Sequence, residues 1–309
     1  MSARQISLGI ALVLLAAAGP LLGSSYHQSF LLQLFTMVAL AQSWNLISGM
    51  TGYVSFGHAA FFGVGAYAGT LLIQFGFPWW LAIIKGSLIA LLVSVPLGFL
   101  TLRLRGPYFA IAMLGLNEVA RIVATLWVDL TNGGSGITLS PSLLPSLTVN
   151  YYLMLALAVI ATVIVACVYY SRFGLELRAI REDEGAAEMV GVNTTRAKLA
   201  AFVLSALIPG AAGTVNVMYT SYINPSSAFD PALNIQMIVM VMFGGTGTVW
   251  GPVLGASIVM LLRELLWAQF PALHLAMLGV MLLAVVLFLP GGIMALFVKK
   301  KIARPEVAS

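Results

Sequence analysis

The sequence has very few charged residues for its length. Only 8% of its 309 residues are Asp, Glu, Lys or Arg, whereas 61% are apolar and the mean hydropathy is +1.01. Soluble domains carry about 25% charged residues, so a soluble fold of this length is excluded and the chain is an integral membrane protein. The net charge of +5 does not indicate nucleic-acid binding, because the basic residues lie where apolar segments end, as the positive-inside rule requires.

Residues that catalysis or metal binding would need are also scarce. The single cysteine, Cys167, excludes an intrachain disulfide, and the three histidines (His27, His58 and His274) are too scattered for a metal-binding motif. The phosphate-binding pattern G-x-x-x-x-G-K-[ST] is absent, so the chain lacks the usual means of hydrolysing ATP. No Ser, His and Asp set suggests a catalytic triad. We therefore predict no catalytic residue, no cofactor and no metal.

Long continuous apolar runs point to membrane-spanning helices. A β-barrel would show ~10-residue alternating strands, and lipid offers the backbone no hydrogen-bond partners, so helices are required. We predict an all-α polytopic transmembrane bundle that forms one domain over residues 1–309, with about ten spans and with eight or nine as alternatives. The predicted spans are Ile6–Leu22, Phe30–Ile47, Phe56–Phe75, Trp79–Leu102, Pro107–Trp127, Tyr151–Tyr170, Leu199–Tyr219, Ala232–Phe243, Pro252–Trp267 and His274–Phe297.

Three of these segments are unusual. Ala232–Phe243 is too short to cross a bilayer core of about 30 Å alone, so it and Phe56–Phe75 are candidates for broken or re-entrant segments. The first span resembles part of a secretory signal peptide, because Arg4 precedes an apolar run. No A-x-A-like cleavage site follows it, and we expect it to remain as the first helix.

The distribution of charge predicts the topology. The one substantial polar loop, 172–198, carries five basic and five acidic residues, and the C-terminal tail contains Lys299, Lys300, Lys301 and Arg304. The positive-inside rule places this loop and both termini in the cytoplasm. The loop at 129–149 is then external, where its polar, turn-rich sequence either meets a soluble partner or serves as a plain connector.

A glycine pattern occurs twice, about 195 residues apart. Residues 49–54 and 244–249 share G-x-T-G-x-V, which suggests an internal repeat. Interrupted segments at corresponding places in two halves are typical of a transporter's substrate path, although small residues also serve close helix packing. The candidate path residues in and near the two patterns are Asn45, Thr51, Gly52, His58, Thr246 and Gly247.

One predicted span contains a charged pair. Glu118 and Arg121 are three residues apart, so they are neighbours on one helical face. Charged side chains inside a membrane usually face a bundle interior or a wet path. The pair either holds helices together or, with the adjacent Asn117, lines the translocation path, and we retain all three as path candidates.

The 172–198 loop predicts a short helix that suits docking. Its acidic start is stabilised by the helix dipole, and Gly191 is a natural C-cap. Between them, Ala186, Ala187 and Val190 form a small apolar knob. Such a helix fits a groove on another protein, whereas a solvated loop is the alternative. The candidate docking residues are Arg181, Glu182, Asp183, Glu184, Ala186, Ala187, Val190 and Gly191.

Several stretches together resemble a known family. Asn45–Thr70, Leu102–Ile111, Asn117–Arg121, Gly174–Gly213 and the segment FGGTGTVWGPVLGA look like the permease subunits of branched-chain amino acid ABC importers. The long loop and the LRLRG segment are more similar to the M-type permease than to the shorter H-type.

This resemblance implies a permease of the bacterial inner membrane that forms a translocation path with an H-type permease. It also implies two cytoplasmic ATP-binding subunits, a periplasmic solute-binding protein, and a coupling helix around 184–191. The broader pattern of such loops is E-A-A-x-x-x-G, whereas here Gly185 separates Glu184 from the two alanines, so Glu184 is given no specific contact. The implied solutes are branched-chain amino acids, although the family also carries urea, short amides and other small solutes.

The alternative function is that of an ion-coupled secondary transporter which works alone. Such a protein would not need a docking helix in its cytoplasmic loop, and it would usually contain more ionisable residues inside the membrane than Glu118 and its neighbour. A membrane enzyme has no candidate site in this sequence.

Overall fold

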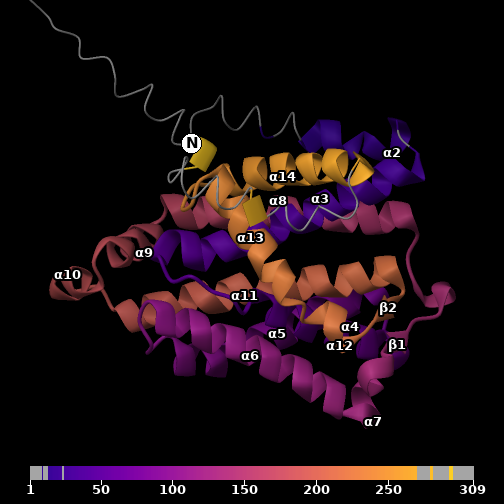
Figure 1. Cartoon of the computed structure of the whole chain (residues 1–309), viewed down its shortest axis with the longest axis horizontal. Helices are drawn as coiled ribbons and strands as arrows, with labels where there is room; N and C mark the ends of the chain where they lie inside the picture. The colour runs from indigo at the N-terminus through magenta and orange to yellow at the C-terminus, as the bar shows by residue number, and fades with distance from the viewer. Residues whose placement is uncertain (1–8, 10–12, 23, 270–278, 281–291, 295–309) are drawn as a thin grey trace, which may run out of the picture.

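The computed structural model of the chain describes residues 9, 13–22, 24–269, 279–280 and 292–294. Within them, helices run side by side along one long axis (Figure 1). The long helices are α3 (Ser25–Trp44), α4 (His58–Gln74), α5 (Trp79–Thr101), α6 (Pro107–Leu126), α8 (Leu147–Tyr170), α9 (Arg172–Glu182), α11 (Thr194–Thr220), α13 (Pro231–Gly244) and α14 (Gly251–Gln269). Shorter elements are α2 (Gly19–Leu22), the π-helix η1 (Asn45–Gly49), α7 (Val128–Thr131), the 3-10 turns η2 (Gly133–Ser135) and η3 (Pro141–Leu143), α10 (Glu184–Met189) and α12 (Pro225–Ala228).

The predicted all-helical membrane fold is confirmed, whereas the predicted number of spans is not. Six segments of the described chain are long and apolar enough to cross a membrane: 25–49, 79–101, 107–126, 147–170, 194–220 and 225–244. The predicted spans Phe56–Phe75 and Pro252–Trp267 correspond to α4 and α14, which are not among these six. The predicted span Ile6–Leu22 lies partly, and His274–Phe297 largely, outside the described residues.

Small residues hold the centre of the bundle together. Helix α11 packs against α4 and α5, and a Cβ added to Gly65 of α4 would collide with the backbone of Gly210 of α11. One turn further along α11, the hydroxyl of Thr214 donates to the carbonyl oxygen of Gly65 at 2.9 Å. Because glycine lets two backbones approach this closely, the G-x-x-x-G spacing from Gly65 serves helix packing.

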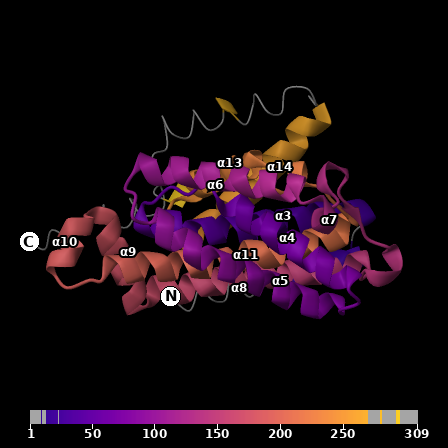
Figure 2. The ribbon, with the colours of Figure 1, turned by 90° about the horizontal axis from the view of Figure 1, so that it is seen from below.

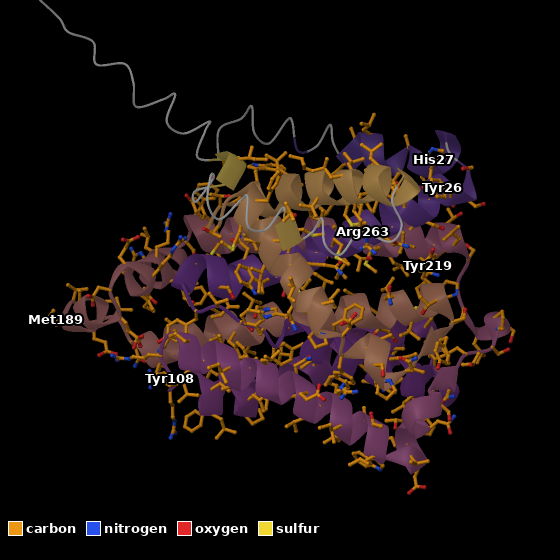
Figure 3. The ribbon with its side chains drawn as sticks, viewed as in Figure 1. Tyr26, His27, Tyr108, Met189, Tyr219 and Arg263 are labelled. Atoms are coloured by element: carbon orange, nitrogen blue, oxygen red, sulfur yellow. The ribbon has the colours of Figure 1, made fainter. Side chains whose placement is uncertain are left out.

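The two ends of the bundle carry different structures. Helices α9 and α10 lie at one end and α7 at the other, as both views show (Figures 1 and 2). Strands β1 (Ile137–Thr138) and β2 (Tyr222–Ile223) lie at the same end as α7 (Figure 1). Figure 3 places Met189 at the tip of the first end and Tyr26 and His27 near the second. Strands β1 and β2 pair antiparallel, with Ile137 opposite Ile223. The 129–149 loop is thus tied to the segment that follows α11 instead of running free.

Candidate coupling site and paired glycine turns

Each copy of G-x-T-G-x-V forms a turn between two helices. The first leads from η1 to α4 and the second from α13 to α14. The fourth residue of each copy has a left-handed backbone, with φ of 79° at Gly52 and 71° at Gly247, and this conformation favours glycine. The two copies therefore share backbone conformation as well as sequence at this position, which supports their equivalence.

The two turns contact each other directly. The side chain of Asn45 accepts a hydrogen bond from the backbone nitrogen of Gly247 at 2.8 Å, and donates one to the carbonyl oxygen of Thr248 at 2.9 Å. A Cβ on Gly49 would lie 2.8 Å from the nitrogen of Gly247, closer than real Cβ contacts. We call residues 49–54 and 244–249 the paired turns. Asn45 acts as their buried connector, since it is fully buried.

The side chain of Arg181 reaches both paired turns from α9. Its Nη1 donates to the carbonyl oxygen of Gly49 at 2.7 Å, and its Nη2 donates to the hydroxyl of Thr246 at 3.4 Å. The loop that was predicted for docking thus touches the segments that were predicted for the substrate path.

A buried charged network joins α10 to the first turn. Lys198, on the first turns of α11, is 3% exposed, and its ammonium donates to Glu184 Oε1 at 2.6 Å, to Tyr53 Oη at 3.0 Å and to the carbonyl oxygen of Leu102 at 3.2 Å. The Tyr53 hydroxyl donates to the other oxygen of Glu184 at 2.5 Å. We call Tyr53, Glu184 and Lys198 the coupling network. It connects the first turn to α10 and α11 and, through the Leu102 carbonyl, to the end of α5.

This network shifts the pKa values of Glu184 and Tyr53, which lie outside the spans. Burial alone would raise the pKa of the Glu184 carboxyl, but hydrogen bonds from Lys198 and Tyr53 outweigh it and hold that pKa below its ordinary value of 4.5. Burial, followed by the adjacent carboxylate, raises the pKa of the Tyr53 hydroxyl. Glu184 is therefore charged and Tyr53 neutral at physiological pH.

Helix α10 has well-formed caps at both ends. The carboxylate of Asp183 accepts from the nitrogen of Ala186 at 2.8 Å, which is an N-cap. At the other end Gly191 has φ of 90°, and the nitrogens of Gly191 and Val192 donate to Glu188 and Ala187, which is a Schellman motif. The predicted cap at Gly191 is confirmed. Glu182 instead ends α9.

The predicted composition of the apolar knob is partly wrong. Ala187 is 2% exposed and packs in the core, because the cap pulls this face of α10 onto the bundle. The exposed apolar side chains are Met189 at 85% and Val190 at 80%, and Met189 stands at the tip in Figure 3. Sequence analysis missed Met189, although it directly precedes Val190.

Besides Asn45, three of the path candidates lie inside the bundle. Asn117 is fully buried and donates to the carbonyl oxygen of Phe229 at 2.9 Å. His58 is also fully buried, at the start of α4, with Nδ1 3.0 Å from the Ser55 hydroxyl. Thr51, in the first turn, is 2% exposed and donates to Ile47. Asn117 thus lies on the buried face of α6, whereas the neighbouring charged pair lies on its exposed face.

Glu118 and Arg121 form the expected ion pair, but on the outer face of the chain. The Nε of Arg121 donates to both carboxylate oxygens of Glu118, at 3.1 and 2.9 Å. Their side chains remain 43% and 36% exposed respectively, on a helix whose exposed face also carries Ile111 and Val119.

The structure brings together Asn45, Gly52, Thr246 and Gly247 with Arg181. Sequence analysis missed Tyr53 and Lys198 as site residues, because Lys198 was interpreted only as a topological charge and Tyr53 as a variable position of the glycine pattern. Among the described residues, no group of three or more His, Cys, Asp or Glu side chains is placed to hold a metal ion.

Residues 26–286 match the model of a family described as the permease component of branched-chain amino acid transport systems. The chain belongs to this permease family. It is 28% identical to the permease protein LivM of the high-affinity branched-chain amino acid transport system of Salmonella typhimurium, over 92% of this chain and 74% of that protein.

Other relatives extend the range of solutes. Identity is 25% to the LivH permease protein of the same transport system in Salmonella typhimurium, over 90% of this chain and 97% of the relative. It is 24% to the fructose import permease protein FrcC of Rhizobium meliloti, over 84% of this chain and 76% of the relative. No solved structure matches the chain.

Proposed function

We propose that the chain is the M-type permease subunit of an ATP-driven importer of branched-chain amino acids or related small polar solutes. Its family and its similarity to LivM support this function. The structural observation that carries the proposal is α10, a capped helix with exposed Met189 and Val190 whose loop contacts both paired turns. A secondary transporter that works alone would have no use for such a docking helix.

In this proposal the end of the bundle that carries α10 faces the cytoplasm. This chain and a second permease form a heterodimer, and each of the two binds one ATP-binding subunit. Helix α10 of this chain inserts Met189 and Val190 into a groove of the ATP-binding subunit that it contacts. A periplasmic solute-binding protein delivers solute to the opposite end, where the 129–149 loop lies. The chain has ten spans in the bacterial inner membrane, with both termini cytoplasmic, and acts in transport without being an enzyme.

We further propose that the outer face of α6 borders the translocation path beside the H-type permease. An ion pair in lipid contact is unfavourable, so charged residues within spans face protein or water. Glu118 and Arg121 are too exposed in the single chain to satisfy that rule without a second subunit. Asn117, on the buried face of α6, and His58, at the buried start of α4, are further candidates for the path.

Reconstitution into liposomes tests the proposed function. The complete set of two permeases and two ATP-binding subunits should take up leucine with its binding protein and ATP. The chain alone should take up none, with or without an ion gradient. Leucine uptake by the chain alone, driven by a proton or sodium gradient, would establish the secondary transporter instead.

A further inference from the structure

Arg181 contacts both copies of the internal repeat. It hydrogen-bonds to the first residue of one glycine pattern, Gly49, and to the third residue of the other, Thr246. It also packs on the left-handed glycine of each copy. A Cβ on Gly52 would lie 3.4 Å from its Cγ, and a Cβ on Gly247 would collide with its Nη1. The absence of a side chain at Gly247 thus leaves the space that the guanidinium of Arg181 occupies, whereas at Gly52 the contact is an ordinary one.

We propose that Arg181 is a positioning residue that clamps the paired turns together and releases them when α10 moves. This inference rests on the proposed function, since the movement of α10 is attributed to the ATP-binding subunit. Arg181 lies three residues before Glu184, and Asp183 alone separates α9 from α10. A displacement of α10 is therefore transmitted to Arg181 over a very short length of backbone.

An arginine side chain can hydrogen-bond to two separate segments at once. Its planar guanidinium offers donors in different directions at once, whereas the ammonium of lysine is a point charge. Among the described residues of the 172–198 loop, Arg181 is the one whose side chain hydrogen-bonds to the second turn. The coupling network reaches only the first turn, through Tyr53.

The exposed position of Arg181 allows it to release the paired turns. Arg181 is exposed, so its guanidinium exchanges its protein partners for water without leaving a buried charge unpaired. The connector Asn45, by contrast, is fully buried. Release of Arg181 leaves the Asn45 hydrogen bonds as the remaining polar link between the turns, and these are uncharged and weaker than bonds from a guanidinium.

A buried reporter in the first turn tests the clamp in the complete transporter. Thr51 is 2% exposed, and a cysteine there, in a Cys167→Ser background, reacts with a water-soluble maleimide only when the turns separate. We expect Arg181→Gln to raise the rate of labelling about tenfold, as the loss of a charged hydrogen bond implies. In the chain without the reporter, the same substitution should reduce ATP-driven leucine uptake. Arg181→Lys should fall between the natural residue and Arg181→Gln in both measurements, and the ATP-binding subunits should still co-purify.

Arg172→Gln is the matched control, since it removes the same charge from the same helix at an exposed position. It should leave the labelling rate unchanged. An unchanged labelling rate in both Arg181 variants would overturn the clamp while leaving the proposed function intact. Loss of the ATP-binding subunits at unchanged labelling would show that Arg181 is a docking contact and overturn the clamp as well. Failure of the complete transporter that contains the natural chain to take up leucine with ATP would instead contradict the proposed function.

Discussion

Replacement of Lys198 by methionine should destabilise the chain more than any other removal of a single charge in the cytoplasmic loop. The side chain of Lys198 is 4% exposed, and that of its ion-pair partner Glu184 is 14% exposed. Methionine keeps much of the volume of the stem, so the substitution removes the charge with little loss of packing. It leaves the Glu184 carboxylate and the Leu102 carbonyl without their common donor.

The expected magnitude follows from these contacts. Breaking a buried ion pair by removing one partner costs about 3–5 kcal/mol. Glu184 retains the Tyr53 hydroxyl as a donor, the Nε of Arg105 at 3.8 Å and some access to water, so we expect about 3 kcal/mol for Lys198→Met. Glu184→Gln should cost about 2 kcal/mol, because Lys198 keeps two neutral acceptors. The double variant should cost about 3 kcal/mol instead of the additive 5, because no unpaired charge remains.

Equilibrium unfolding of the purified permease in mixed micelles, followed by circular dichroism, measures these free energies. Lys85→Met is a matched control, because Lys85 lies on α5 with its ammonium 4.0 Å from the centre of the Phe77 ring. It should cost less than about 1 kcal/mol. If the effects of Lys198→Met and Glu184→Gln add to within about 0.5 kcal/mol, the two residues do not interact and the coupling network is wrongly described.

Three further predictions concern docking, the charged pair and pH. Val190→Asp should lower co-purification of the ATP-binding subunits more than about tenfold, because docking would bury an unpaired carboxylate. The control Val128→Asp, at a valine that is 60% exposed at the opposite end of the bundle, should leave co-purification unchanged. Equal recovery of the ATP-binding subunits with both variants in a pull-down would show that α10 is not part of the interface. Glu118→Gln and Arg121→Gln should each lower expression and leucine uptake more than the double change does. If the pair lines the path, the double variant should recover expression while leucine uptake stays low. Simple addition of the two effects would mean that the pair does not act as a unit. The pKa of Glu184 is lowered in the folded chain, so its stabilising effect is complete above the ordinary value of 4.5 and is lost as pH falls through the lowered folded value. The stability difference between the natural chain and Glu184→Gln should therefore shrink below pH 4.5, and a difference that grows in acid would contradict the sign of the shift.

Local features of the sequence predicted much of the fold and of the coupling loop. The apolar runs located the long helices, and Gly191 marked the end of α10, because both depend on periodicity and backbone preference within a few residues. The ion pair of Glu118 and Arg121 was also predictable, since a spacing of three residues places both on one helical face.

Contacts between distant segments were not predictable in the same way. The sequence offers no sign that Tyr53, Glu184 and Lys198 meet, because their proximity depends on how η1, α5 and α11 converge at one end of the bundle. The burial of Ala187 and the exposure of Met189 were missed for a related reason. A six-residue helix is too short for a hydrophobic pattern to fix which face turns inward, and the core beneath it decides.

Site-specific photo-crosslinking from Met189 tests the central claim, that the α10 end of this permease receives the ATP-binding subunit. A photoreactive amino acid at position 189 should crosslink to the ATP-binding subunit in membranes that contain the complete transporter. The same residue at Ser142, an exposed site in the 129–149 loop, should not. A crosslink to the ATP-binding subunit from position 142, with none from position 189, would contradict both the topology and the docking role of α10.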